Sequence, residues 1–255
     1  MQLSALGRIL PSSLRRMVLP AWNNMLRWEH AHHERRFLQP LVRSGDLVFD
    51  IGCNVGDKTD VLLDLGAAVV AVDPSAVCVE RVKHRFKNAV AMGRLHTECV
   101  AVGSKPGEIN VTMIDPVSGM YSGSADFLKY VSEIGYAGTG TRTVACLTLD
   151  QLVARYGKPA LIKIDVEGMD AEVLEGLRER PRYLSFEYHT SPTVWSRTEQ
   201  CFAEATRLGF ERANLTDATA PNFVLPSWVP LPAALDQLRQ WASTSSGRWG
   251  DVFLA

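Results

Sequence analysis

The sequence predicts an α/β fold in which a mostly parallel sheet is covered by helices on both faces. From Gly45 onward, short strand-like segments alternate with segments of helical periodicity. The predicted strands are continuous apolar runs, as expected for strands that are buried on both sides. Ligands of such sheets bind at the carboxyl ends of the strands. Polar residues follow several of the runs, namely Asp50, Asp73, Asp165, Glu187 and His189.

Residues 1–44 predict a helical extension in front of an α/β domain of residues 45–255. Between Ala21 and Gln39, apolar and aromatic side chains recur at three- and four-residue steps and therefore share one helical face. Only two of His30, His32 and His33 face the same way on this helix, so we interpret them as packed or solvated residues rather than metal ligands. The extension is expected either to cover the binding site or to mediate a homodimer.

The first half of the domain predicts three strands and two helices. An apolar run ends at Ile51, and the helix that follows stops at Gly66, a residue type common just after a helix. Ser75 is a suitable N-cap for the next helix. The expected strands are residues 47–51, 68–72 and 95–102, and the expected helices are residues 57–65 and 76–87.

The second half predicts six strands and three helices. The strands are expected at 109–114, 143–147, 160–165, 182–187, 210–215 and 251–255, and the helices at 149–156, 171–177 and 194–208. The glycine- and serine-rich stretch 118–124 predicts a mobile segment, either a lid or a plain surface loop. Residues 216–248, which contain several prolines and tryptophans, are expected to be a packed connector.

Composition excludes several classes of protein. The net charge is -1, and no basic stripe suggests binding to nucleic acid. No apolar run approaches the roughly 20 residues that would span a bilayer, and we expect no signal peptide. The 5 cysteines are scattered and form no metal or disulfide motif, so a reducing, cytoplasmic location is expected.

The stretch VFDIGCNVGDKTD, residues 48–60, has the form of a nucleotide-binding turn. A dinucleotide fingerprint requires a glycine where this chain has Asn54, and Asp57 at the helix start would repel a pyrophosphate. S-adenosylmethionine carries no phosphate, and its sulfonium and ammonium groups make it positively charged. Asp50 is expected to face the ammonium group, Gly52 to admit close backbone contact, and Asp73 to accept the ribose hydroxyls.

Several motifs together resemble the FkbM-type methyltransferases. They are the stretch just described, AVDPS at 71–75, AVG at 101–103, LTLDQL at 147–152 and LIKIDVEGMDAEVLEGL at 161–177. The resemblance implies a Rossmann-like, doubly wound sheet of seven strands whose last strand, 251–255, is antiparallel. It also implies methyl transfer from S-adenosylmethionine to a hydroxyl of a sugar, polyketide or other secondary metabolite. The expected cofactor-binding residues are Asp50, Gly52, Asn54, Gly56, Thr59, Asp73, Pro74, Ala101 and Asp165.

The acceptor side is expected to involve Asp165, Glu187 and His189, because a hydroxyl acceptor must lose a proton. A metal is not expected, and the alternative is a magnesium ion held by Asp165, Glu167 and Glu187. Lys163 precedes Asp165 by two residues and should point to the same side of its strand, where it can pair with an acid.

Other functions stay open at this point. The chain is expected to act on a small molecule, but an N- or C-methyltransferase and an enzyme acting on a macromolecule are alternatives. A dehydrogenase using NAD and a catalytically silent binding module are less consistent with the altered glycine pattern and the acidic strand ends. The sequence leaves the acceptor itself unspecified.

Overall fold

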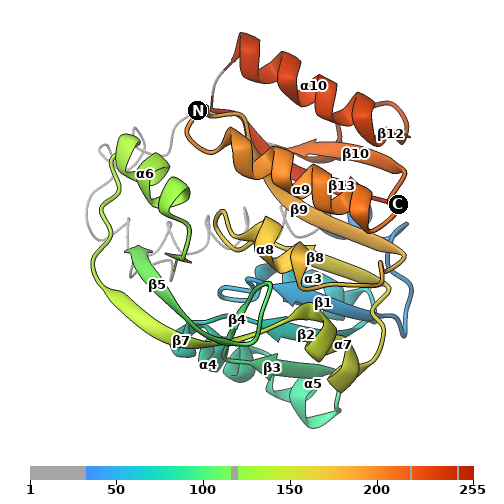
Figure 1. Ribbon diagram of the computed structural model, residues 1–255. Helices are drawn as coiled ribbons and strands as arrows, with labels where there is room; N and C mark the ends of the chain where they lie inside the picture. The colour runs from blue at the N-terminus through green and yellow to red at the C-terminus, as the bar shows by residue number, and fades with distance from the viewer. Residues whose placement is uncertain (1–32, 116–119, 219, 246) are drawn as a thin grey trace, which may run out of the picture.

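A twisted sheet forms the centre of the protein (Figure 1). The computed structural model describes residues 33–115, 120–218, 220–245 and 247–255. Seven strands lie in the order β10-β13-β9-β8-β1-β2-β3, and only β13 runs against its neighbours. This arrangement confirms the predicted fold. The bounds are β1 Leu47–Ile51, β2 Ala68–Val72, β3 Leu95–Glu98, β8 Leu161–Ile164, β9 Tyr183–His189, β10 Arg212–Asp217 and β13 Trp249–Leu254.

Helices cover both faces of this sheet, as predicted. They are α3 Asp57–Asp64, α4 Ala76–Arg85, α5 Lys87–Ala91, α7 Leu149–Tyr156, α8 Asp170–Glu175 and α9 Trp195–Arg207. Successive strand residues belong to different cores: Val48 packs in the cluster that contains α3 and α4 residues, and Phe49 in the cluster that contains α7, α8 and α9 residues. The period of two residues along a strand thus separates two apolar cores.

The segment before β1 packs on the α3 side of the sheet. Residues 33–38 are helical, and Leu38, Leu41 and Val42 are buried in the same cluster as α3. Phe37 contacts Phe253 of β13 with ring centroids 5.1 Å apart. The rest of the predicted helix 21–39, including His30 and His32, lies outside the described residues, so the role of the extension and its boundary at residue 44 stay predictions.

A second, four-stranded sheet was not predicted. Its order is β4-β7-β5-β6, with bounds β4 Ala101–Val102, β5 Gly107–Asp115, β6 Met120–Ser122 and β7 Thr141–Leu147. The predicted strand 95–102 is wrong in its second half: β3 ends at Glu98, and β4 pairs with β7 instead of continuing along β2. The pairing partner lies more than forty residues away in the chain, which local sequence patterns cannot indicate.

The stretch interpreted as mobile contains regular structure where it is described. Residues 120–122 form β6, and 118–119 lie outside the described residues. A helix that was not predicted, α6 Ala125–Glu133, follows. Ser124 caps it by accepting a hydrogen bond from the Phe127 amide at 3.2 Å, and this serine is the signal that could have revealed the helix.

The predicted connector 216–248 is also largely ordered. It contains β11 Ala220–Phe223 and β12 Val229–Pro230, which both pair with β10, and α10 Leu231–Thr244. Pro232 stands in the first turn of α10, where its missing amide costs no hydrogen bond, and Leu231, Ala234 and Leu238 are buried. Prolines therefore mark the start of a helix here rather than an irregular connector.

The described residues contain no helix with both the length and the apolar character needed to cross a bilayer. All five cysteines are free: Cys53, Cys78, Cys99, Cys146 and Cys201.

The loop after β1 lies directly against the loop after β8, and this contact requires a glycine. Gly52 has φ +80, and a Cβ atom there would lie 1.7 Å from the Asp165 carbonyl oxygen. We expect Gly52→Ala to lower the free energy of unfolding by more than about 2 kcal/mol, measured by urea denaturation. Gly45→Ala is the control, because Gly45 has φ +85 with no neighbour within 4 Å. Equal losses in the two variants would show that the loop contact is unimportant.

Candidate functional site

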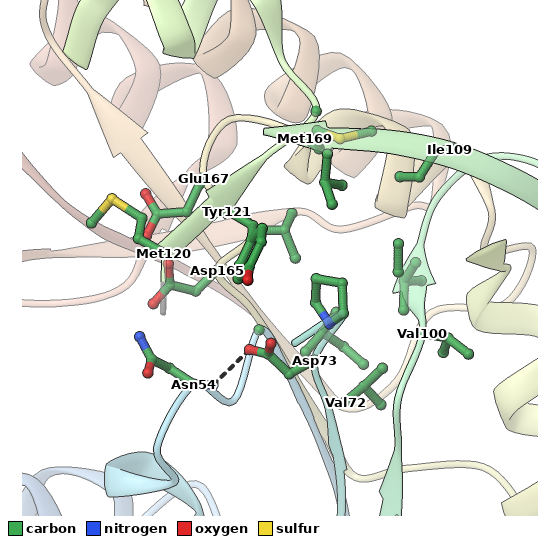
Figure 2. A pocket seen from close by; sticks show the side chains of 18 residues that line it. Asn54, Val72, Asp73, Val100, Ile109, Met120, Tyr121, Asp165, Glu167 and Met169 are labelled. Atoms are coloured by element: carbon green, nitrogen blue, oxygen red, sulfur yellow. Dashed lines mark hydrogen bonds between the residues drawn. The ribbon is translucent and has the colours of Figure 1, made fainter. Parts of the chain in front are cut away.

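A pocket lies at the carboxyl ends of β1, β2 and β8 (Figure 2). We call it the strand-tip pocket. The second sheet supplies its opposite wall through β4, β5 and β6, so the sheet missed by the sequence analysis completes the site. The pocket encloses about 670 Å³ of empty space, part of it open to solvent. It is lined by Ile51, Gly52, Asn54, Val72, Asp73, Pro74, Val100, Ala101, Val102, Ile109, Val111, Met120, Tyr121, Gly123, Asp165, Val166, Glu167 and Met169.

Six of the predicted cofactor-binding residues line this pocket: Gly52, Asn54, Asp73, Pro74, Ala101 and Asp165. Asp50, Gly56 and Thr59 do not. Asp50 is completely buried and shares the strand side of Val48, which faces α3. Its Oδ2 accepts a hydrogen bond from the Thr59 hydroxyl at 2.6 Å, so Asp50 connects β1 to α3 on the α3 side of the sheet. The assignment of all nine residues to cofactor binding stays a prediction.

Asp73 follows β2 and is held in place by backbone amides. Its Oδ2 accepts from the Asn54 amide at 2.9 Å and its Oδ1 from the Ser75 amide at 2.8 Å. Asn54 reaches this position with φ 47, in the left-handed region that asparagine tolerates. Burial raises the pKa of Asp73 to about 6, even though the two amides counteract it. Each oxygen still has a free acceptor site for a ligand.

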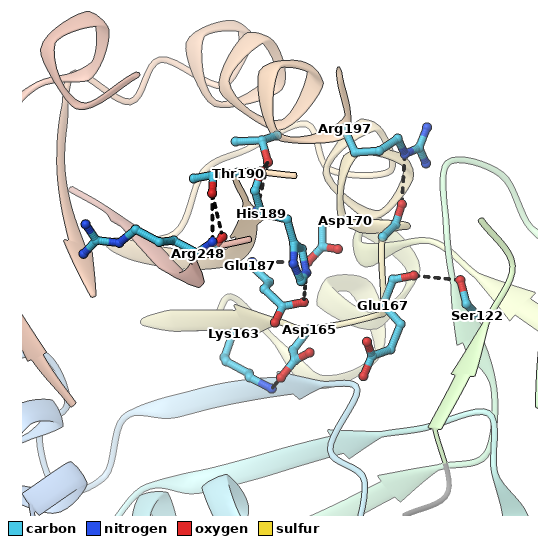
Figure 3. Close-up of polar contacts among 12 residues, drawn as sticks. Ser122, Lys163, Asp165, Glu167, Asp170, Glu187, His189, Thr190, Arg197 and Arg248 are labelled. Atoms are coloured by element: carbon cyan, nitrogen blue, oxygen red, sulfur yellow. Dashed lines mark hydrogen bonds and ion pairs between the residues drawn. The ribbon is translucent and has the colours of Figure 1, made fainter. Parts of the chain in front are cut away.

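The buried Lys163 forms an ion pair with the partly exposed Asp165 at the tip of β8 (Figure 3). The Lys163 ammonium lies 2.8 Å from Asp165 Oδ2 and 3.9 Å from Asp50 Oδ1, which confirms that Lys163 and Asp165 point to the same side. Burial alone would raise the pKa of Asp165, but Lys163 and then Lys58 hold it below its usual value. Asp165 is therefore an ionised carboxylate in the pocket at neutral pH.

Glu187 and His189, the other two predicted catalytic residues, lie outside the strand-tip pocket. They line a smaller cavity, here called the β9 cavity, together with Phe127 of α6, Asp170 of α8 and several residues of α9. His189 Nε2 lies 3.0 Å from Glu187 Oε2, as Figure 3 shows. Burial lowers the pKa of His189 despite the nearby Asp170 carboxylate. The two residues line a different cavity from Asp165, although burial and then the Asp165 charge raise the pKa of Glu187. Their catalytic role stays a prediction.

Glu167 is the pocket residue that the sequence analysis undervalued. It was named only as a magnesium ligand, yet its side chain lines the pocket beside Asp165 (Figure 2). The signal was its place two residues after the predicted strand 160–165 and directly before Gly168. Among the described residues, no group of three or more His, Cys, Asp or Glu side chains is arranged to hold a metal ion. The magnesium assignment to Asp165, Glu167 and Glu187 stays a prediction.

Comparison with known proteins identifies the family. Residues 50–212 match the model described as the methyltransferase FkbM domain. The chain belongs to the FkbM methyltransferase family. The match begins at the end of β1 and contains the Asp73 turn, the second sheet, the IKIDVEG segment and β9. It confirms the resemblance found in the sequence motifs.

A curated relative of this FkbM-family chain is the hexuronic acid methyltransferase AglP of Haloferax volcanii, which is 26% identical over 159 residues. The alignment covers 59% of this chain and 58% of the relative, so it spans little more than half of either protein.

Solved structures with a similar fold include an O-methyltransferase from Bacillus cereus in complex with SAH, with 10% identity, a TM-score of 0.46 and coverage of 97% of this chain and 92% of that one. Another is a TehB-like SAM-dependent methyltransferase from Corynebacterium glutamicum, with 14% identity, a TM-score of 0.43 and coverage of 92% and 98%. At these scores they carry no argument about function.

One acid of the β9 cavity, Asp170, makes the stability of this FkbM-family chain depend on pH. Asp170 is 4% exposed, and burial, followed by the Asp165 charge, raises its pKa to about 7. Between its unfolded pKa of 3.8 and about 7, the folded state holds a proton that the unfolded state has lost. Stability therefore falls as pH rises through this window and changes no further above it.

We expect Asp170→Asn to remove this loss. Relative to the native chain, the variant should gain about 2 to 3 kcal/mol of unfolding free energy between pH 5 and pH 8. Urea denaturation at several pH values measures the gain. Asp126→Asn, at an exposed position on α6, is the control and should show no such trend. A constant difference between native chain and Asp170→Asn across the range would contradict the assignment.

Proposed function

We propose that this chain is an S-adenosylmethionine-dependent methyltransferase that methylates a hydroxyl oxygen of a small molecule. The observation that carries the proposal is the charge of the strand-tip pocket. Its described lining contains three carboxylates, Asp73, Asp165 and Glu167, and no lysine, arginine or histidine. Such a lining suits a donor with sulfonium and ammonium cations and no phosphate, and it opposes a pyrophosphate.

The start of α3 supports the same choice of ligand. Asp57 and Asp60 stand in the first turn of this helix and both pair with Arg85 of α4. In dinucleotide-binding proteins this helix end faces the pyrophosphate. Here two carboxylates occupy it, so the helix dipole is already compensated within the chain.

Strand order sets the direction of the bound donor. β2, β1 and β8 are adjacent, so the tips of β2 and β8 are separated by two strand spacings, about 10 Å. With its ribose hydroxyls on Asp73 and its adenine against Pro74 and Ala101, the donor would extend across β1 toward Asp165. Its sulfonium and methyl group would then lie near the tip of β8.

Methyl transfer at that position is an in-line displacement. The acceptor oxygen must approach the methyl carbon opposite the sulfur, at about 3 Å. The sulfonium is already activated, so the main task of the protein is to hold the two reactants in line. The name of the Haloferax relative supports a sugar as the class of acceptor.

The first experiment separates this proposal from its alternatives. We expect calorimetric titration to show binding of S-adenosylhomocysteine and none of NAD, because the described lining of the pocket has no lysine, arginine or histidine to meet a pyrophosphate. Tritiated methyl should then pass from S-adenosylmethionine to a panel of sugars, phenols and amines, with an alcohol as the best acceptor. Binding of NAD alone would contradict the proposal, and transfer only to amines would contradict its O-methylation part.

Asp73 provides the second test. Loss of charge-assisted bonds to ribose should make Asp73→Asn bind S-adenosylhomocysteine more than about tenfold more weakly. In the native chain, affinity should fall as pH drops below about 6, where Asp73 takes up a proton. The variant should lack this pH dependence, and the exposed control Asp126→Asn should keep it. Native affinity in Asp73→Asn at pH 7 would remove Asp73 from the ribose site.

A further inference from the structure

The turn after β8 holds Glu167 in a fixed position at one end of the strand-tip pocket. Glu167 has φ 56, a left-handed conformation that is unusual for glutamate. The Ser122 hydroxyl of β6 donates a hydrogen bond to the Glu167 carbonyl oxygen at 2.7 Å (Figure 3). Arg197 of α9 donates through Nε to the Gly168 carbonyl oxygen at 2.9 Å. Both sheets and a helix therefore hold this turn.

Close packing adds to this restraint. Gly168 has φ +87, and a Cβ atom there would lie 2.7 Å from the Cβ of Phe127 on α6. The unusual backbone of Glu167 is thus imposed from several directions. Strained backbone that is held in this way is typical of functional sites.

The two acids of the turn differ in their partners. Asp165 is paired with Lys163 at 2.8 Å, and this pair keeps it ionised. The Glu167 carboxylate, in contrast, has no hydrogen bond or ion pair with any described residue. A carboxylate without a protein partner that lines a pocket is available to a ligand.

The charges around Glu167 favour uptake of a proton. Burial raises the pKa of Glu167 well above the usual value. The nearby carboxylates of Glu187, Asp165 and Asp170 raise it further, and the Lys163 ammonium group offsets only part of the increase. Of two ionised carboxylates, the one with the higher pKa is the stronger base. Asp165, whose pKa is lowered, is the weaker base of the two.

We propose that Glu167 is the general base that takes the proton from the acceptor hydroxyl. This inference rests on the proposed methyltransferase function and on the direction of the donor across the strand tips. In the step, the O–H bond breaks and its proton passes to the Glu167 carboxylate. The oxygen electron pair forms the bond to the methyl carbon, and the sulfur–carbon bond breaks with its electrons left on sulfur.

Nuclear magnetic resonance tests the position of Glu167 without any acceptor. The protein is labelled with ¹³C at the glutamate carboxyl carbon, and Glu167→Gln identifies the resonance. We expect it to titrate above the usual range for glutamate. Its midpoint should be lower with S-adenosylmethionine than with S-adenosylhomocysteine, because only the former carries a positive sulfonium beside the carboxylate.

Kinetics test its chemical role with the acceptor found in the methyl-transfer assay. We expect Glu167→Gln to lower kcat by about 100-fold or more, to keep the KM for the donor within about twofold, and to lose the acidic limb of the pH profile. Glu167→Asp should restore part of the rate. Glu175→Gln, the same change at an exposed position on α8, is the control and should behave like the native chain.

The outcomes separate the two proposals. Failure to bind either adenosyl compound would overturn the proposed function itself. Binding with equal midpoints for the two compounds, or native turnover in Glu167→Gln, would overturn only the role of Glu167.

Discussion

The Lys163 ammonium group, buried between the carboxylates of Asp50 and Asp165, joins the parts of the site. Asp50 and Lys163 are register partners on β1 and β8, so the sheet itself sets their distance. A buried charge is stable only when it is paired, and here one cation serves two acids. Asp50 in turn holds Thr59 of α3, and Lys163 holds Asp165 at the pocket. The Lys163 ammonium group therefore interacts both with Asp50, which binds Thr59 of α3, and with Asp165, which lines the pocket.

This arrangement divides the acids at the strand tips into two kinds. Asp165, which pairs with Lys163, has its charge compensated and stays ionised, whereas burial raises the pKa of Asp50 despite the same ammonium group. Glu167, Glu187 and Asp170, in contrast, hold their protons more tightly, because burial and the charges of neighbouring acids, Asp165 among them, raise their pKa values. A site for a cationic donor and a site for proton uptake can therefore lie side by side. The same chemical group performs two tasks because burial and neighbouring charges differ.

The central sheet and the strand-tip acids could be predicted because they follow from local patterns. Continuous apolar runs located β1, β2 and β8, and each polar residue after a run marked the edge where ligands bind. The second sheet could not be found in this way, since β4 has only two residues and its partner β7 is distant in the chain. The side on which Asp50 lies was predictable from strand alternation with Val48, but its place at the end of an apolar run and the positive charge of the donor suggested the pocket instead. The difference in partners and pKa between Asp165 and Glu167 could not be predicted from the sequence, because it depends on how three separate elements pack around one turn.

The account depends on a cationic, phosphate-free donor lying across the tips of β2, β1 and β8. The most direct measurement is a crystal structure of the protein soaked with S-adenosylhomocysteine. The account predicts ribose hydroxyls on the Asp73 carboxylate and the sulfur near the turn of Asp165 and Glu167. A ligand bound elsewhere, or one reversed so that its adenine lies at the tip of β8, would contradict it.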